Sequence, residues 1–575
     1  MRRWIPVFAG AWIFLLLFVA YNLLNNNADD KTEEILAQLS QCKRKYASNS
    51  FDHLHTQIRL LKQELEETKK KLGEPRGEGS CPPCRAPACA PQKSSESNEA
   101  QGAGAGDSTA PWSLTTNLRK RDKVRRRVLN TMREMWFYIR RQLGAVKDTA
   151  GGEIKSRLSD ILDDLIGYYQ SAATDIVSLG EIGGMKEWRQ GQADLATSMI
   201  TKRIQGLQEP DDCTKSKRLV CDLGKGCGFG CQIHHVFYCM ATAFGTGRTF
   251  IVQGQSWSYS RSGWNGVFKP TSAKCESHGT GHSMWRGDDD ETDVIKMPII
   301  DGVSPRPKAL PLAVPSEFVE VIEGFHTYPS VYWFGHLARY IMRYAPAVKE
   351  SIDKRLEEIG FKHPIVGIHV RRTDKINTEA AFHHVKEYML HVEEWYLELE
   401  RTTKVDKRRV YLASDDPKAI DEARSQFPAY EFLNDKSSSL SAGVGSRYSD
   451  AGLKGVVFDI EVLSRTDFLS CTFSSQVCRV AYELMQPLHI DAGDKFRSLD
   501  DIYYFGGQRG HDQRAIYPHK GRNGQLDIEV GDLFGIAGNH WDGYSKGTNR
   551  RTGRLGMYPA YKVEEVQQTY DAVRR

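Results

Sequence analysis

The chain has 575 residues, of which 40% are hydrophobic and 26% are charged, and its formal net charge is +5. This composition is typical of a globular protein and excludes a largely disordered chain. The length predicts two to four domains, and so small a net charge gives no argument for a nucleic-acid partner.

The N-terminal residues predict a membrane anchor. Arg2 and Arg3 precede an uncharged, mostly apolar run from Trp4 to Leu24, and about 20 such residues span a bilayer. A cleavable signal peptide is the alternative, but no cleavage site of the A-x-A type follows the run. Because positive charges keep the short end cytoplasmic, we expect a cytoplasmic tail over 1–4, a signal anchor over 5–24 and a luminal body.

The segment after the anchor predicts a stem. Apolar residues in 4-3-4-7 steps favour a short, dimeric coiled coil over 31–72, with a lone amphipathic helix as the alternative. Residues 73–113 are rich in Gly, Pro, Ser and Ala, which is typical of a flexible linker. The coiled-coil positions are Leu54, Ile58, Leu61, Leu65 and Leu72.

A second helical region follows over 114–207. It opens with the basic run RKRDKVRRR from Arg119 to Arg127. A nucleic-acid arm is one interpretation, but in a luminal protein a solvated helix face is favoured. Periodic apolar segments at 154–166 and 185–207 predict a helical hairpin or small bundle, which we expect to support a homodimer.

Strands and helices alternate through most of the remaining chain. Strands are expected at 249–252, 365–370, 409–413, 430–433 and 467–471. Helices are expected at 236–244, directly after a tight turn at CGFGC (Cys227–Cys231), and at 332–344, 345–360, 385–401, 418–426 and 455–464. This alternation predicts an α/β catalytic domain over 208–508 with a Rossmann-like parallel sheet, the nucleotide-binding part covering about 362–500. Short strands between Gly-rich turns predict a small SH3-like β-barrel over 509–566.

The stretch Ile365 to Lys375, IVGIHVRRTDK, carries the clearest chemical signal. A buried strand ends at Arg371 and Arg372, and ligands of open α/β sheets bind at strand carboxyl ends. Paired guanidiniums there suit phosphate oxygens. A surface arginine pair is the alternative, but the neighbouring His369 and Lys375 favour an anionic ligand.

Two further strands end in polar residues. One ends in Ser414-Asp415-Asp416, and another leads to Ser474-Ser475 at an expected helix start, where backbone N–H groups bind phosphate. Simple capping without a ligand is the alternative for the serines. No Walker or G-x-G-x-x-G motif is present, which argues against NTP hydrolysis and hydride transfer. Asp415 and Asp416 point to opposite sides of an extended chain, so no metal is expected, and Glu379 is the candidate base.

Twelve cysteines suit an oxidising lumen. Six of them lie within 63 residues, from Cys213 to Cys275, and Cys471 and Cys478 form another close pair. Disulfides are favoured over zinc, because the spacing matches no standard zinc site.

The motifs HVRRTDK, YLASDD and CTFSSQVCRVAYELMQ, together with the SH3-like tail, resemble the eukaryotic alpha-1,6-fucosyltransferases of the Golgi. The resemblance covers roughly Leu118 to Val563. It implies a GT-B-like fold in a type II Golgi membrane protein. It also implies inverting, metal-independent transfer of fucose from GDP-fucose to the 6-hydroxyl of the innermost N-acetylglucosamine of N-glycans.

The resemblance also implies roles for individual residues. Glu379 is the base, with Lys375 and Asp374 beside it. The donor-binding residues are His369, Arg371, Arg372, Tyr259, Asp415, Asp416, Asp459, Ser475 and Gln476. The acceptor-binding residues are Lys225, Asp301, Tyr504 and His540, although packing is an alternative for His540. The implied disulfides are Cys213–Cys275, Cys221–Cys239, Cys227–Cys231 and Cys471–Cys478.

Two other functions compete with this interpretation. A GDP-fucose enzyme that modifies protein side chains has a similar arginine motif, but the SSQVCR segment and the β tail argue against it. An anchored scaffold protein would leave Arg371, Lys375, Glu379 and Ser475 without a purpose. Stabilisation by GDP would distinguish an enzyme from a scaffold.

Overall fold

The computed structural model describes residues 110–255, 257–276, 281–373, 381–443, 445–505 and 512–573. All of these belong to one compact unit, Ala105–Arg575. The expected anchor, coiled coil and most of the linker lie outside the described residues. No helix within the described ranges has the length and apolar character needed to cross a membrane.

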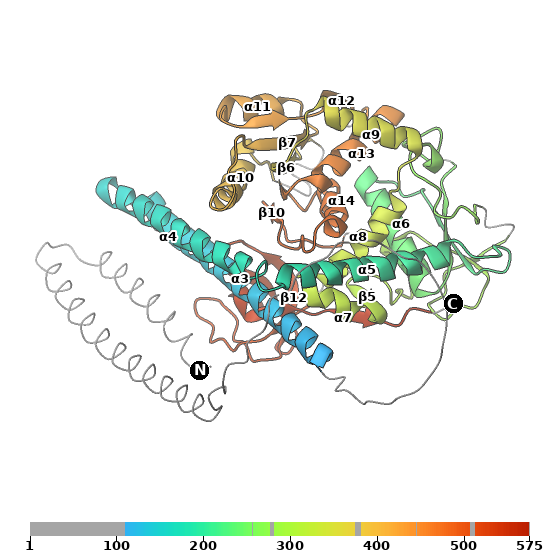
Figure 1. Ribbon diagram of the computed structural model, residues 1–575, viewed down its shortest axis with the longest axis horizontal. Helices are drawn as coiled ribbons and strands as arrows, with labels where there is room; N and C mark the ends of the chain where they lie inside the picture. The colour runs from blue at the N-terminus through green and yellow to red at the C-terminus, as the bar shows by residue number, and fades with distance from the viewer. Residues whose placement is uncertain are drawn as a thin grey trace, which may run out of the picture. The chain divides into compact units, whose positions relative to one another are not determined.

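The N-terminal part of this unit is helical. Helices α3 (Ala110–Thr149) and α4 (Gly152–Ser178) lie antiparallel, side by side (Figure 1). The sequence predicted a hairpin or small bundle from the segments 154–166 and 185–207, which belong to α4 and to the next helix. Helix α4 begins at Gly152, whose φ of +45° is a conformation that favours glycine. Trp136 stacks on Tyr169 at 5.9 Å between ring centroids. Helix α5 (Met185–Gln208) follows and packs on α7 (Ser316–Phe325).

The first sheet has four parallel strands in the order β2-β1-β4-β3. Its strands are β1 (Arg218–Asp222), β2 (Thr249–Gln253), β3 (Ser283–Met284) and β4 (Val294–Lys296). Helix α6 (Phe229–Gly245) connects β1 to β2 and is buried over nearly its whole length. The sequence predicted this helix only from residue 236, because the glycines of CGFGC suggested a turn; the first turn instead begins directly after the extended Gly228.

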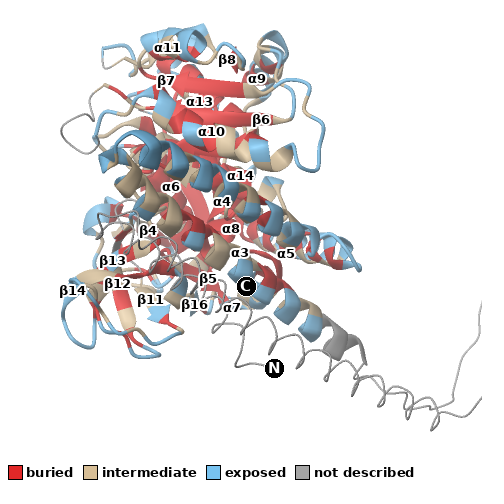
Figure 2. Ribbon diagram, turned by 90° about the vertical axis from the view of Figure 1, so that its left-hand side faces the viewer, coloured by how far each residue is buried: buried red, intermediate tan, exposed pale blue. Residues whose placement is uncertain are grey.

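The second sheet has five parallel strands in the order β10-β9-β6-β7-β8. Strand β6 (Ile365–Val370) is buried at every position (Figure 2), as its apolar run predicted. The other strands are β7 (Arg409–Ser414), β8 (Glu431–Leu433), β9 (Phe468–Cys471) and β10 (Phe496–Ser498). The strand–helix alternation therefore builds two parallel sheets, where the sequence patterns alone indicated one.

Helices cover both faces of the second sheet. The described helices of this region are α8 (Pro329–Ile341), α9 (Pro346–Glu358), α10 (Val385–Leu399), α11 (Lys418–Gln426), α12 (Lys436–Ser441), α13 (Asp450–Arg465) and α14 (Gln476–Met485). Helix α13 begins earlier than predicted because Ser449 caps it, accepting a hydrogen bond from the backbone N–H of Gly452 at 3.1 Å. Such a cap satisfies one of the free N–H groups of a helix start.

The C-terminal sheet is antiparallel, with strand order β14-β13-β12-β11-β15. Its strands are β11 (Asp512–Ala515), β12 (Leu533–Asn539), β13 (Tyr544–Asn549), β14 (Leu555–Pro559) and β15 (Val563–Glu565). They enclose a small core that includes Phe534 and Tyr558. Beyond it, β16 (Gln568–Tyr570) returns to pair with β5 (Ala313–Pro315), a contact the sequence did not predict.

Candidate active site

Because side chains alternate along β6, Arg371 and Arg372 at its end are directed to opposite sides of the second sheet. Alternate residues of a strand point to opposite faces. Ile365 belongs to the hydrophobic cluster that contains α13 and α14, whereas Val366, Ile368 and Val370 belong to the cluster under α10 and α11. His369 therefore shares the α13 side with Ile365.

Asp415 organises the end of this strand. Its carboxylate is buried and accepts hydrogen bonds from the backbone N–H groups of Arg372, at 2.8 Å, and Thr373, at 3.2 Å. It also accepts from the Thr373 hydroxyl and forms an ion pair with Arg371 at 3.1 Å. A carboxylate with this many donors holds the turn after β6 in one conformation, which orients the Arg371 guanidinium.

Arg372 instead contacts residues of α11 and of the segment just before α10. Its Nη1 lies 2.7 Å from Glu422 and 3.5 Å from Asp416, while Nε and Nη2 both donate to the carbonyl of His383. The side chain is 5% exposed. Glu422 also accepts from the backbone N–H of Val385 at 3.0 Å. Arg372 and Glu422 thus join the end of β6 to the start of α10.

Two buried titratable groups flank the strand end. Burial lowers the pKa of His369 to about 4, with the Arg371 charge adding to the effect. Its Nδ1 is buried and has no hydrogen-bond partner among the described residues. Burial raises the pKa of Asp459 on α13 to about 7, although the Tyr411 hydroxyl donates to it at 2.6 Å. His369 is therefore neutral at pH 7, and Asp459 is poised between its two forms.

The N-termini of α6 and α14 meet. A Cβ atom added to Gly230 would lie 2.8 Å from the Cβ of Gln476, so only glycine permits this approach. Ser475 is buried at the N-cap of α14 and makes no side-chain cap bond. Two helix N-termini together present free N–H groups and positive dipole ends, an arrangement suited to phosphate. The Gly228–Gly230 contribution was not identified from the sequence, where these glycines suggested only a turn.

Tyr259 connects these helices with Arg371. A Cβ atom added to Gly228 would lie 4.0 Å from the hydroxyl oxygen of Tyr259. The Tyr259 ring packs edge-on against the ring of Phe229, with 6.0 Å between the ring centroids. Tyr448 packs on its other side at 4.9 Å. Burial raises the pKa of Tyr259 to about 12, and the Arg371 charge acts in the opposite direction. Tyr259 therefore lies against the first turn of α6, where the Arg371 charge acts on it.

The predicted acceptor-binding residues lie in two groups. Lys225 and Asp301 form an ion pair at 2.5 Å. The guanidinium carbon of Arg479 lies over the ring of Tyr504, 4.0 Å from the ring centroid. The backbone carbonyl of Tyr504 accepts a hydrogen bond from Arg479 Nη1 at 3.2 Å. His540 follows β12, and a Cβ added to Gly538 of that strand would lie 3.5 Å from Oδ1 of Asp501, three residues before Tyr504. The barrel thus approaches the segment that carries Tyr504.

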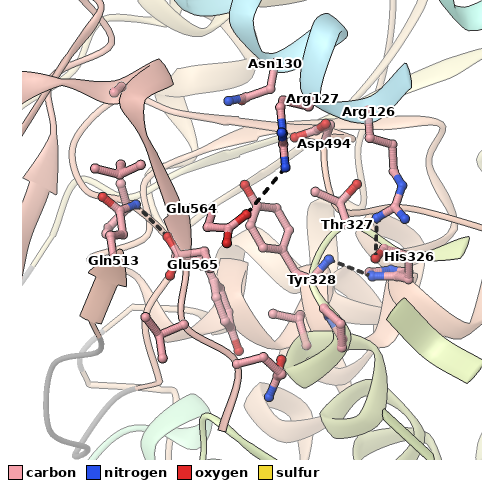
Figure 3. Close-up of a pocket in the computed structure, with 18 of the residues that line it drawn as sticks. Arg126, Arg127, Asn130, His326, Thr327, Tyr328, Asp494, Gln513, Glu564 and Glu565 are labelled. Atoms are coloured by element: carbon pink, nitrogen blue, oxygen red, sulfur yellow. Dashed lines mark hydrogen bonds and ion pairs between the residues drawn. The ribbon is translucent and has the colours of Figure 1, made fainter. Parts of the chain in front are cut away.

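A cavity of about 700 Å³ lies beside this segment, between α3, the start of α8 and the barrel (Figure 3). Arg127 of α3 and Glu564 of β15 form an ion pair at 3.7 Å across it. Tyr503, Phe505 and Trp541 line this cavity. These are chain neighbours of Tyr504 and His540, so the cavity adjoins the region predicted to hold the acceptor.

The cysteines are paired as the resemblance implied: Cys213–Cys275, Cys221–Cys239, Cys227–Cys231 and Cys471–Cys478. Cys221, His235 and Cys239 form the one cluster with metal-ligand spacing in the described part of the chain. Both cysteines belong to a disulfide, so they offer no thiolate, which is the form that binds metal.

The predicted catalytic residues Asp374, Lys375 and Glu379 lie outside the described residues. The segment that contains them is bounded by described residues on both sides: Thr373 is held by Asp415, and His383 by Arg372. The sequence prediction for these three residues stays a prediction.

Comparison with known proteins identifies the class. The model of the alpha-(1,6)-fucosyltransferase N- and catalytic domains matches residues 1–504, and a variant SH3 domain matches residues 515–564. The alpha-(1,6)-fucosyltransferase of Drosophila melanogaster is 42% identical over 453 residues, which are 78% of this chain and 73% of that protein. The Caenorhabditis elegans alpha-(1,6)-fucosyltransferase is 43% identical over 450 residues, 77% of this chain and 78% of that protein.

The protein is a glycosyltransferase with a C-terminal SH3-like domain. This class follows from the matches above and agrees with the parallel sheets and the cationic strand end. The chain belongs to the alpha-(1,6)-fucosyltransferase family. Among solved structures, the fucosyltransferase NodZ from Bradyrhizobium is 16% identical with a TM-score of 0.27, the match covering 47% of this chain and 93% of that one.

Proposed function

We propose that this enzyme transfers L-fucose from GDP-fucose to O6 of the innermost N-acetylglucosamine of N-glycans, with inversion. Family membership and the names of the relatives support the donor and the linkage. The observation that carries the proposal within the structure is that Tyr259 packs on the first turn of α6 and that the N-termini of α6 and α14 meet there, while the Arg371 charge acts on Tyr259. That region has the donors a nucleoside diphosphate needs.

In this proposal the diphosphate lies between Arg371 and the N-termini of α6 and α14, with Ser475 and Gln476 at the phosphates. Asp459 and His369 bind the guanosine end, where an ionised carboxylate accepts from the guanine N–H groups. Arg371, Lys375 and the helix dipoles balance the charge that develops on the leaving GDP. The proposed reaction therefore requires no metal ion and no other cofactor.

Glu379 is the proposed general base. It removes the proton from the acceptor 6-hydroxyl as the oxygen attacks the anomeric carbon, and GDP leaves from the opposite face of the fucose ring. A single base of this kind is the arrangement used by inverting enzymes that act on glycosidic bonds. Lys375, four residues earlier in the sequence, is proposed to keep the carboxylate ionised. Lys225, Asp301, Tyr504 and His540 bind the glycan.

We further propose that the enzyme is a homodimer held by the helical region. Exposed apolar residues recur on α4 at intervals of seven: Ile154 is 62% exposed, Ile161 37% and Tyr168 75%. Val124, Val128 and Met135 of α3 are also exposed. An apolar stripe with heptad spacing suits a partner helix. The predicted anchor and coiled-coil stem would place this dimer in the Golgi membrane with a luminal catalytic domain.

The test of the reaction uses the full chain purified in detergent, GDP-fucose, a defined N-glycopeptide and a chelator. Fragmentation mass spectrometry locates any added deoxyhexose. Fucose on the innermost N-acetylglucosamine supports the proposal. Fucose on an antenna or on the peptide, or transfer that appears only when a divalent metal is added, contradicts it.

A further inference from the structure

A buried histidine–carboxylate pair lies between α6 and α14. His234 Nε2 is 3.0 Å from Glu483 Oε1, and both side chains are shielded from solvent. Neither residue belongs to the donor or acceptor set described above. Burying such a pair costs free energy unless good hydrogen bonds compensate, so its other contacts are informative.

His234 extends from this pair to the donor side. Its Nδ1 lies 2.6 Å from the carbonyl oxygen of Gly230 and 3.0 Å from Oε1 of Gln476. A carbonyl oxygen only accepts, so Nδ1 carries a proton and donates it. His234 thereby ties the first turn of α6 to the first residue of α14, the two helix starts proposed to hold the diphosphate.

Glu483 extends to the acceptor side. The hydroxyl of Tyr503 donates to the same Oε1 atom of Glu483 at 2.7 Å. Tyr504, the next residue, is held by Arg479. Glu483 and Arg479 are four residues apart and lie on one face of α14. One helix face therefore fixes two consecutive tyrosines, one of which is a proposed acceptor contact.

We propose that Glu483 is a positioning residue shared by both substrates: through His234 it holds the helix N-termini at the donor diphosphate, and through Tyr503 it holds the acceptor residue Tyr504. The inference rests on the proposed function, because it uses the donor and acceptor roles assigned there.

The contact of Glu483 with His234 (the donor arm) and its contact with Tyr503 (the acceptor arm) can be removed by separate substitutions. His234→Gln keeps an N–H near Glu483 but loses the contacts of Nδ1, so the KM for GDP-fucose should rise about fivefold while the KM for the glycopeptide stays within about twofold. Tyr503→Phe should have the converse effect. Glu483→Gln replaces the carboxyl group that His234 and Tyr503 both contact by an amide, and it should raise both KM values.

The matched control is Tyr482→Phe. Tyr482 is also a buried residue of α14, but its hydroxyl donates to the backbone carbonyl of Gly493, at 2.7 Å, and not to Glu483. Its loss should cost comparable stability and leave both KM values unchanged. Thermal melting of each variant with and without GDP reports whether it is folded.

The proposal is overturned if Tyr503→Phe and Tyr482→Phe change the two KM values alike, or if His234→Gln and Tyr503→Phe change the same KM. If Glu483→Gln does not fold, the two arm variants decide the question alone. Absence of transfer by the wild-type chain would instead refute the proposed function, so the two failures are distinguishable.

Discussion

Replacing Glu422 by alanine tests whether the contact between β6 and α10 positions the catalytic segment. The substitution removes the charged hydrogen bond to Arg372 at 2.7 Å and the bond from the Val385 N–H at 3.0 Å. Both bonds involve the Glu422 carboxylate, and a hydrogen bond to a charged group contributes about 1.5–3 kcal/mol. Because Asp416, at 3.5 Å, still compensates part of the Arg372 charge, we expect a loss of about 3 kcal/mol, the lower end of the sum for two such bonds.

The kinetic effect should fall mainly on kcat. Glu422 binds both ends of the segment that contains Glu379 but lies on the side of the sheet opposite His369 and α13. A small displacement of a catalytic group costs on the order of tenfold to a hundredfold in rate. We therefore expect kcat to fall at least tenfold while the KM for GDP-fucose changes less than about twofold.

Urea denaturation and initial-rate kinetics measure the two effects. Glu422→Gln is the matched variant, because its amide oxygen can still accept one of the two hydrogen bonds; it should give intermediate losses in both assays. An alanine variant with a wild-type denaturation midpoint and a wild-type kcat would refute the reasoning. A rise in donor KM without loss of kcat would show that this contact acts on the donor site instead.

Three other predictions follow from the site and the helical region. Asp459, whose pKa is raised to about 7 by burial, should bind guanine as the carboxylate. GDP affinity should then fall by up to tenfold per pH unit below 7, and binding should release protons, measurable by calorimetry in two buffers; Asp459→Asn should weaken binding and flatten this dependence. The same shift makes the folded state bind an extra proton at Asp459 between about pH 4 and 7, whereas the lowered pKa of buried His369 acts in the opposite direction. Without ligand, the stability of the wild type relative to Asp459→Asn should therefore decline as pH rises through that window; a relative stability that rises in a thermal-melting series would contradict this. Arg371→Lys should raise the KM for GDP-fucose tenfold or more, since an ammonium cannot form paired bonds to phosphate; an unchanged donor KM would remove Arg371 from the diphosphate site. If the proposed dimer forms through α4, Ile161→Glu, at a 37% exposed position of that helix, should shift the protein from dimer to monomer in sedimentation experiments, whereas Asp160→Glu beside it should not; a dimer in both would place the interface elsewhere.

The strongly apolar strands of the second sheet were predictable from sequence. In β6 and β9 the apolar run coincides with the strand and is buried throughout. Shorter elements were missed: β1 has only three central apolar residues, Leu219 to Cys221, and β16 consists of Gln568, Thr569 and Tyr570. Such strands form because a parallel partner strand pairs with them. The partner comes from a distant segment, so the local sequence pattern carries no information about it.

The chemistry of the site was predictable to a more limited extent. The strand end at Arg371 and the helix start at Ser475 followed from local patterns. The different surroundings of Arg371 and Arg372 did not, because they depend on Asp415, Glu422 and α10, which come from distant segments. The pairing of α6 with α14 and the Gly230–Gln476 approach are likewise tertiary contacts without a local signal.

The most direct test of the central claim compares the wild-type chain with Glu379→Gln in the glycopeptide assay, together with GDP binding by calorimetry. Glutamine keeps the size of the side chain but cannot take the acceptor proton. The account predicts that kcat falls by at least about a hundredfold while the Kd for GDP stays within about threefold. Transfer by the variant at a wild-type rate would contradict the assignment of Glu379 as the base, and the mechanism built on it would have to be abandoned.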